Sequence, residues 1–231
     1  MSSYGHLASE YYDGALHPTS RAFREGSVHL LGPLLSALTD ERVLEVGSGR
    51  SVLLEFRVHG PAVVTDIDGE MLSYSEQRFP DSTSFAWADA KRLPFRDSCF
   101  DMIVASLGDP YNEAPFWSEA FRVLRPGGQV FMTVPAFSWS RRFRTNGLTS
   151  QAEFISHNGS PVLVPSHIYS SADQADLVQR AGLELSDVSS VGASDIPSFA
   201  LAPKLDGASE ETVTLLQVRK PSAARWSEGC Y

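Results

Sequence analysis

The chain has 231 residues, of which 42% are hydrophobic, and this length is typical of one domain with one sizeable core. Its formal net charge of -9 opposes contact with a phosphate backbone, so we expect a small-molecule partner and exclude nucleic acid. Two cysteines are too few for a disulfide framework, and no run approaches the roughly 20 apolar residues of a membrane-spanning helix, so we expect a soluble, cytoplasmic protein.

The first 40 residues are expected to form a helical lid ahead of the first strand. Residues 7–38 combine helical spacing with Gly26, Gly32 and Pro33, which predicts two or three short helices. Residues 41–220 are expected to form the core of the same single domain, and residues 221–231 a tail.

From Arg42 onward, apolar runs that suit strands alternate with segments of helical spacing. This alternation is typical of an α/β fold in which crossover helices connect the strands of a parallel sheet. The strands are predicted at 43–46, 62–66, 84–86, 100–105 and 130–134, and the helices at 52–58, 69–79 and 114–124.

The C-terminal third is expected to begin with an irregular connection, because residues 136–147 have no clean period. Two apolar runs, 153–156 and 162–169, then flank Asn158-Gly159, a dipeptide that accommodates positive φ, which predicts a hairpin over the site. A helix is predicted at 172–181, a loop at 202–209, and the last two strands at 184–191 and 211–219.

Two neighbouring strands end in residues that suit a nucleoside. Residues 43–49, with the sequence VLEVGSG, predict a buried strand that runs into a turn, where Gly47 and Gly49 let a ligand approach the backbone. Asp66 ends the next strand, roughly 20 residues later, where an acidic side chain accepts hydrogen bonds from ribose hydroxyls. The pattern predicts a nucleoside cofactor.

From about residue 41 to residue 219, the chain resembles the class I S-adenosylmethionine-dependent methyltransferases. Four successive blocks carry the resemblance: 44–49 (LEVGSG), 65–72 (TDIDGEML), 88–95 (ADAKRLPF) and 121–128 (FRVLRPGG). The resemblance implies a Rossmann-like three-layer sandwich with a mostly parallel seven-stranded sheet and an antiparallel last strand. It also implies S-adenosylmethionine as the cofactor and no metal.

The resemblance assigns a role to each cofactor residue. It implies that Glu45, Gly47 and Gly49 line the methionine and ribose side, and that Asp66 holds the ribose hydroxyls. Ser51 stands where many relatives have a third glycine, so the turn or the first helix is expected to differ. The other implied contacts are Ile67 stacked on adenine, Asp89 at the adenine amino group, the Ala90 amide at a ring nitrogen, and Ser106.

A dinucleotide is the alternative cofactor for such a fold. Its pyrophosphate needs the N-terminus of a helix, and the carboxylate of Glu45 beside the turn disfavours a phosphate there. A carboxylate suits a cofactor that carries a cationic amino group and a sulfonium, which favours S-adenosylmethionine over NAD.

The loop after the fourth strand, residues 106–112 (SLGDPYN), is the main candidate for chemistry, because ligands bind beyond the carboxyl ends of such strands. Asp109, Tyr111 and Asn112 are the candidate catalytic residues. The Asp-Pro-Tyr segment partly resembles an Asp/Asn-Pro-Pro-aromatic element of amine-directed methyltransferases, without the second proline. The structural alternative is a polar turn that caps a helix at Glu113.

Aromatic and basic residues in the N-terminal lid are candidates for the substrate side. Tyr12 is assigned to the reaction, and Tyr11, His17 and Arg24 to substrate binding, since aromatic faces hold cations and arginine clamps carboxylates. The alternative is an amphipathic helix with packed tyrosines and solvated arginines.

The predicted hairpin supplies two further candidates, His167 as a base and Tyr169 as a substrate contact, if it folds back over the site. A structural role is the alternative for a histidine at a strand end. The basic run 141–144 is expected to be a solvated face.

Three hypotheses of function follow. The first is methyl transfer to a small-molecule amine, carboxylate or hydroxyl. The second is a cyclase or lyase in which S-adenosylmethionine is itself the substrate, for example azetidine-2-carboxylate formation with release of methylthioadenosine. The third is a non-catalytic cofactor-binding module that regulates a partner. The oligomeric state stays open in all three.

Overall fold

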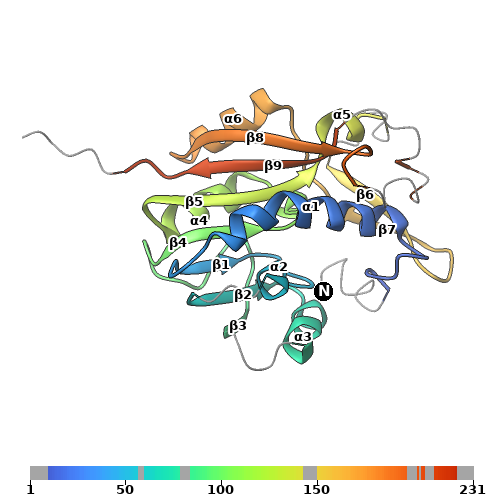
Figure 1. Ribbon diagram of the computed structural model, residues 1–231, viewed down its shortest axis with the longest axis horizontal. Helices are drawn as coiled ribbons and strands as arrows, with labels where there is room; N and C mark the ends of the chain where they lie inside the picture. Colours follow the sequence, from blue (N-terminus) through green and yellow to red (C-terminus); the bar gives the residue numbers. More distant parts are fainter. Residues whose placement is uncertain are drawn as a thin grey trace, which may run out of the picture.

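The computed structural model describes residues 10–56, 60–78, 84–142, 150–196, 202, 204–205 and 211–222. Within them, seven strands form one sheet in the order β3-β2-β1-β4-β5-β9-β8 (Figure 1). Neighbours from β3 to β5 are parallel, and β9 is antiparallel to both β5 and β8, which confirms the expected fold class. The strands are β1 (Val43–Glu45), β2 (Ala62–Asp66), β3 (Ser84–Trp87), β4 (Phe100–Ala105), β5 (Leu124–Pro135), β8 (Glu184–Gly192) and β9 (Glu211–Arg219).

Both faces of the sheet are covered, because its central strands carry buried apolar residues on both faces. Along β1, Val43 packs with Leu31 and Leu35 on one face, whereas Leu44 packs with Trp117 and Val178 on the other. Helices α1 (Pro18–Ser36) and α2 (Val52–Glu55) supply the first layer, and α4 (Ala114–Val123) and α6 (Ser171–Arg180) the second. Helix α3 (Gly69–Arg78) packs on β2 and β3. The carboxyl ends of the parallel strands are thereby left open for ligands.

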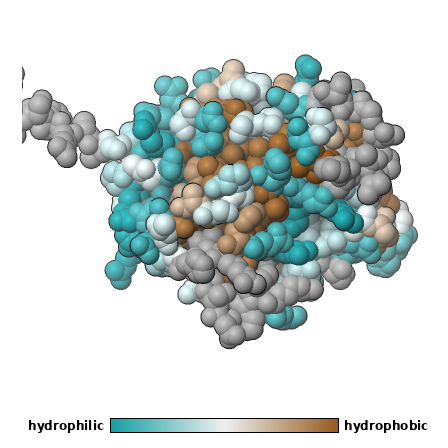
Figure 2. All heavy atoms as spheres, in the orientation of Figure 1, coloured by the Kyte–Doolittle hydropathy of each residue, from teal (hydrophilic) through white to brown (hydrophobic). Residues whose placement is uncertain are grey.

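The N-terminal expectation of two or three short helices is wrong for the described residues, which contain one helix of 19 residues, α1. Pro18 suits its first turn, where no backbone donor is needed. Gly26 and Gly32 are buried, and a Cβ on Gly32 would lie 3.0 Å from the Phe56 ring. Close packing on the sheet therefore overrides the helix-breaking signals. Helix α1 contacts β5 and β9; Figure 1 shows it in front of the sheet beside β5, and Figure 2 shows apolar residues gathered in the middle of that face.

Several boundaries differ from the prediction. Helix α2 has four residues and ends at Glu55, and β5 begins at Leu124 rather than at residue 130. The early part of β5 is held by pairing outside the local sequence, since Gly128 accepts a hydrogen bond from the Lys220 amide at 2.8 Å. A short helix, α5 (Phe137–Ser140), occurs where no structure was predicted.

The predicted hairpin is confirmed as β6 (Gln151–Ile155) and β7 (Pro161–Pro165), which pair antiparallel around Gly159 at φ +83°. Its second strand is shorter than predicted, because residues 166–169 leave it and return to the loop after β4. There the His167 amide donates to the Asp109 carbonyl at 2.7 Å. Among the described residues, no helix is long and apolar enough to cross a membrane.

Candidate functional site

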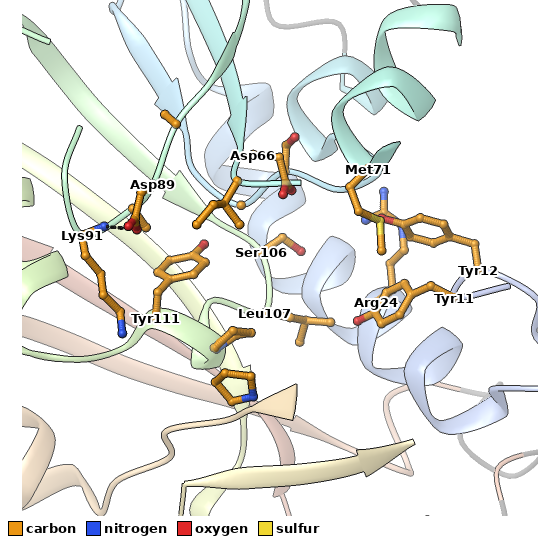
Figure 3. A pocket seen from close by; sticks show the side chains of 17 residues that line it. Tyr11, Tyr12, Arg24, Asp66, Met71, Asp89, Lys91, Ser106, Leu107 and Tyr111 are labelled. Carbon is orange, nitrogen blue, oxygen red and sulfur yellow. Dashed lines mark hydrogen bonds between the residues drawn. The ribbon is translucent and has the colours of Figure 1, made fainter. Parts of the chain in front are cut away.

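A cavity of about 390 Å³ lies at the carboxyl ends of β1, β2 and β4, beside the N-terminal segment that precedes α1. Figure 3 shows Asp66 and Met71 on one side of it, Tyr11 and Tyr12 at one end, and Asp89 and Lys91 at the other. The predicted site residues that line it are Tyr11, Tyr12, Arg24, Gly47, Asp66, Ile67, Asp89, Ala90, Ser106 and Tyr111.

The glycine turn after β1 forms one wall and requires its glycines. Gly47 and Gly49 have φ of +60° and +47°, a conformation that side chains rarely adopt. A Cβ on Gly47 would lie 2.5 Å from a ring carbon of Tyr111, and one on Gly49 would overlap the Tyr12 hydroxyl. Gly49 itself does not line the cavity, and its amide donates to the Asp66 carboxylate at 2.8 Å.

Asp66 places a nearly buried carboxylate at the cavity. It is 7% exposed and also accepts from the Asp68 amide at 2.9 Å, so the turn after β1 and the start of α3 both orient it. Burial raises the pKa of Asp66, although the amides of Asp68 and Gly49 oppose the shift. A polar ligand that donates hydrogen bonds would replace the water that this carboxylate loses.

The opposite end of the cavity suits a flat ring. Ile67 exposes 44% of its surface there, which is unusual for so large an apolar side chain. Its carbonyl accepts from the Trp87 indole at 2.7 Å, which holds the residue in place. The Asp89 carboxylate accepts from the Lys91 amide at 2.9 Å, next to Ala90. The exposed Ile67 side chain can stack on a flat ring, and the Asp89 carboxylate lies in the same cavity lining. This is the arrangement that the family resemblance implies for adenine.

Glu45 does not face the cavity, contrary to the expectation. Its carboxylate is fully buried beneath the turn, where it accepts from the Val52 amide at 2.8 Å and from the Ser51 hydroxyl. Glu45 therefore caps α2. Ser51, at the position where many relatives have a third glycine, donates its hydroxyl to the same carboxylate. Burial raises the pKa of Glu45 to about 7, despite the hydrogen bonds from Ser51 and Val52. Of the two carboxylates at the ends of β1 and β2, only that of Asp66 lines the cavity.

The loop after β4 contributes Ser106, Leu107 and the short 3₁₀ helix η2 (Asp109–Tyr111). The Tyr111 ring lines the cavity, and its hydroxyl donates to the Val46 carbonyl at 2.6 Å. Burial raises the pKa of Tyr111 well above its usual value, so the hydroxyl keeps its proton. Tyr111 shapes the wall rather than acting as a base.

Asn112 is a structural residue in this fold, which corrects its catalytic assignment. It is 0% exposed and lines neither of the two cavities described here. Its amide nitrogen donates to Gln174 at 2.8 Å and to the His167 carbonyl at 3.1 Å, and its oxygen accepts from the Trp117 indole at 2.9 Å. These bonds tie the loop to α4 and α6.

The N-terminal segment brings Tyr11, Tyr12 and Arg24 to the cavity. Tyr12 stacks on Tyr74 of α3 with ring centroids 5.0 Å apart, and its hydroxyl accepts from the Arg50 amide. Burial raises the pKa of Tyr12 to about 12. Arg24 pairs with Glu55 at 2.9 Å and lies 5.9 Å from the Tyr12 ring, which puts a cation beside aromatic faces.

A second cavity of about 640 Å³ adjoins the first and shares Tyr11 and Leu107 with it. Asp109 lines this second cavity, 7% exposed, and accepts a hydrogen bond from the Ser166 hydroxyl. His17 also lies here, 3.7 Å from Glu10. The walls come from α1, α5 and the hairpin and are largely apolar, including Leu16, Phe23, Trp139, Phe154, Leu163 and Ile168.

His167 and Tyr169 line neither cavity, which corrects their assignments as base and substrate contact. The ring of His167 lies 3.5 Å from the carboxylate of Glu113, which also pairs with Lys91. Glu113 is the N-cap residue of α4, as the capping alternative has it, but its side chain makes no capping hydrogen bond. Burial raises the pKa of Tyr169.

Comparison with known proteins supports one family. Residues 44–132 match the family model described as a methyltransferase domain. A ubiquinone/menaquinone biosynthesis C-methyltransferase, UbiE, from Bartonella tribocorum is 33% identical over a match that covers 56% of this chain and 55% of that protein. The chain contains a methyltransferase domain, and these similarities support the class I S-adenosylmethionine-dependent methyltransferase family.

Two solved members of the fold support the architecture. A methyltransferase from Methanosarcina mazei superposes with a TM-score of 0.60 at 17% identity, covering 80% of this chain and 94% of that one. A 1,6-didemethyltoxoflavin-N1-methyltransferase from Burkholderia thailandensis, solved with S-adenosylhomocysteine, gives 0.58 at 18% identity and covers 94% and 86%. The methyltransferase domain match and these structures support S-adenosylmethionine as the cofactor.

The match with the curated relatives spans about half of their length. The methyltransferase family therefore accounts for the cofactor cavity, whereas the second cavity is formed largely outside the matched residues. Within the described residues, no group of three or more His, Cys, Asp or Glu side chains could hold a metal.

Sequence reasoning missed several lining residues of this methyltransferase. Ser48, Ala88, Lys91, Leu107 and Pro110 adjoin predicted site residues in the chain, so adjacency was a usable signal. No such signal exists for the lining residues of the hairpin and of α5, because only tertiary packing brings them to the cavities. These residues are Pro165, Phe154 and Trp139.

Proposed function

We propose that this methyltransferase transfers the methyl group of S-adenosylmethionine to a small molecule held in the second cavity. The observation that carries the proposal is the junction of the two cavities at Tyr11 and Leu107. A nucleoside in the first cavity and an acceptor in the second would meet there, and alignment is the main contribution that a protein makes to such a displacement.

The lining of the first cavity supports this cofactor. Asp66 would accept from ribose hydroxyls, and Ile67 and Asp89 would flank adenine. The glycine turn carries no Cβ that would collide with Tyr12 or Tyr111, and Arg24 supplies a cation in the lining for the carboxylate of the cofactor. The cofactor supplies a methyl group on positively charged sulfur, so no metal is needed.

The second cavity favours an acceptor with a ring over a short charged molecule, because most of its wall is aromatic or aliphatic. Asp109 lines the second cavity two residues along the chain from Leu107, and the Ser166 hydroxyl donates to its carboxylate. We assign it the proton that leaves a hydroxyl or amine as the new bond to the methyl carbon forms. The UbiE relatives, whose name describes a C-methyltransferase of quinone biosynthesis, support a small-molecule acceptor of this kind.

The test is to incubate the protein with S-adenosylmethionine, alone and with ring-bearing phenols, quinols and amines, and to identify the nucleoside product by mass spectrometry. We expect S-adenosylhomocysteine only when an acceptor is present. Asp109→Asn should lower kcat about 10²-fold or more, as loss of a proton acceptor does. The matched control Asp176→Asn, an exposed position on α6, should retain activity. Full activity of Asp109→Asn would contradict the assigned role.

A second candidate function is cleavage or cyclisation of the cofactor itself. The observation that favours it is the crowding of Tyr11, Tyr12 and Tyr111 around the glycine turn, where aromatic faces would steady a sulfonium. In that reaction the amino group attacks the gamma carbon of the methionine moiety and methylthioadenosine leaves. If methylthioadenosine is released in the absence of any acceptor, the protein cleaves or cyclises the cofactor and the proposal of methyl transfer is wrong.

A further inference from the structure

Three buried hydroxyl groups link α1, β5 and the loop after β4. The Ser27 hydroxyl lies 2.7 Å from that of Thr133 and 2.7 Å from that of Ser106. Ser27 and Thr133 are 0% exposed, in a layer between α1 and the sheet that is otherwise apolar. Buried polar groups are costly unless they are paired, so packing alone gives no reason for hydroxyls at these positions.

The hydroxyl chain ends on a strained residue. Leu107 has φ +53°, in the left-handed region that a leucine rarely adopts. Its amide donates to the Thr133 hydroxyl at 2.9 Å, and the next amide, of Gly108, donates to the Thr133 carbonyl at 2.9 Å. Thr133 thus holds the loop in this conformation from both its side chain and its backbone.

The strained residue lies where the two cavities meet. Leu107 lines both of them and packs against the cluster that contains Phe23 and Trp139. Figure 3 shows its side chain between Tyr111 on one side and Arg24 and Tyr11 on the other. A glycine would adopt the same φ without strain. The strain of a leucine at this position is therefore explained only by a role of its side chain.

We infer that Leu107 is a specificity-determining residue that sets the width of the passage between cofactor and acceptor, and that Thr133 and Ser27 are positioning residues that hold it. The inference rests on the proposed function. Removing the Thr133 hydroxyl releases the Leu107 amide and lets its side chain move out of the passage. Of the candidate cofactor residues, Ser106 joins these hydroxyls through Ser27, whereas Asp66 and Asp89 make their hydrogen bonds elsewhere, so the contacts of those two carboxylates stay intact.

The decisive comparison is Thr133→Val, which keeps the shape of the side chain, with Thr133→Ser, which keeps the hydroxyl. We expect Thr133→Val to raise KM for the acceptor about tenfold, to change affinity for S-adenosylhomocysteine less than about twofold, and to speed hydrogen exchange of the Leu107 amide. Thr133→Ser should restore all three values. Equal behaviour of the two variants, or an unchanged Leu107 amide in Thr133→Val, would overturn the positioning role.

Leu107→Ala keeps the hydroxyl chain and tests the passage directly, even if a Thr133 variant fails to fold. We expect it to accept bulkier acceptors, with their kcat/KM rising about tenfold relative to the smallest acceptor, while S-adenosylhomocysteine still binds. If Leu107→Ala and the wild type have the same acceptor preference, the role of Leu107 is refuted and the proposed methyl transfer still stands. Absence of methyl transfer by the wild-type protein with every acceptor, despite S-adenosylhomocysteine binding, would refute the proposed function and the role of Leu107 with it.

Discussion

Glu45 and Asp66 are both buried carboxylates beside the glycine turn, yet only Asp66 meets the cavity. Burial raises the pKa of each, and the amides around them oppose the shift. The difference lies in direction, since Glu45 points beneath the turn towards Val52 and Asp66 towards the cavity. Acidic residues at two neighbouring strand ends thus differ in their surroundings: Glu45 caps a helix and Asp66 lines the cavity.

Glu45 should make the stability of the fold depend on pH. Burial raises its pKa to about 7 from 4.5, so the folded protein binds the proton more tightly than the unfolded chain does. The free energy of unfolding therefore falls as pH rises from 4.5 to 7 and stays lower above it, by on the order of 3 kcal/mol.

Glu45→Gln carries no titrating group and should flatten this dependence. Urea unfolding at pH 5 and pH 8 measures it, and the exposed Glu184→Gln is the control that should keep the wild-type slope. An equal pH dependence in Glu45→Gln and wild type would show that Glu45 is ionised in the fold at neutral pH.

At the scale of elements, the β6–β7 hairpin contacts the N-terminal segment through the Phe154 ring, which meets Tyr11 and His17, and through hydrogen bonds to Glu10. Glu10 accepts from the backbone amide of His157 at 3.1 Å and contacts its ring nitrogen at 2.6 Å. Burial by itself would raise the pKa of Glu10, but the hydrogen bonds from His157 lower it below its usual value. The carboxylate therefore stays ionised until pH falls through this lowered pKa.

Glu10→Gln should release the hairpin, because an amide is a weaker acceptor than a carboxylate for the His157 donors. We expect amide hydrogen exchange of residues 151–165 to speed up severalfold while exchange in β4 and β5 stays unchanged. The control Asp187→Asn, an exposed position on β8, should leave both regions as in wild type. Unaltered exchange in the hairpin of Glu10→Gln would mean that other contacts hold it.

At the scale of the whole molecule, both cavities are formed by distant segments that meet only in the folded protein. A nucleoside that binds there therefore binds the folded state and not the unfolded chain. A ligand that binds the folded state at 100 times its Kd adds about 2.7 kcal/mol of stability. For a chain of this length, that corresponds to a rise in Tm of about 5 to 10 °C.

S-adenosylhomocysteine should produce this rise, and NAD should produce none. Asp66→Asn should lose most of the rise, because its amide is a weaker acceptor for ribose hydroxyls, whereas Asp176→Asn should keep it. Thermal unfolding of the three proteins with each ligand is the measurement. A full rise in Asp66→Asn would place the ribose elsewhere.

Local patterns in the sequence predicted the sheet and the cofactor side of the site. Apolar runs of strand length and the VLEVGSG turn are contiguous, so the physical constraint is visible in a few neighbouring residues. The strand-end pattern predicted the place of Asp66, and the family resemblance implied Ile67 and Asp89 beside it; the structure brings all three to one cavity. Parallel strands gather the loops at their carboxyl ends, so residues at successive strand ends meet there.

The direction of each side chain was decided by tertiary structure alone. Glu45, Asn112 and His167 follow predicted strand ends or loops, yet they turn towards helix ends and neighbouring loops. The hairpin was predicted from Asn158-Gly159, but its contact with Glu10 joins residues 147 positions apart. The same holds for Ser27 and Thr133, which are 106 positions apart.

By itself, the sequence determined the strand-and-helix alternation, the glycine turn and the acidic strand end, because each depends on residues close together in the chain. The tertiary structure decided the second cavity, the corrected roles of Glu45 and Asn112, and the strained Leu107 at the passage. The physical reason is that these features depend on packing between distant elements, where burial and hydrogen-bond partners are set by which surfaces meet.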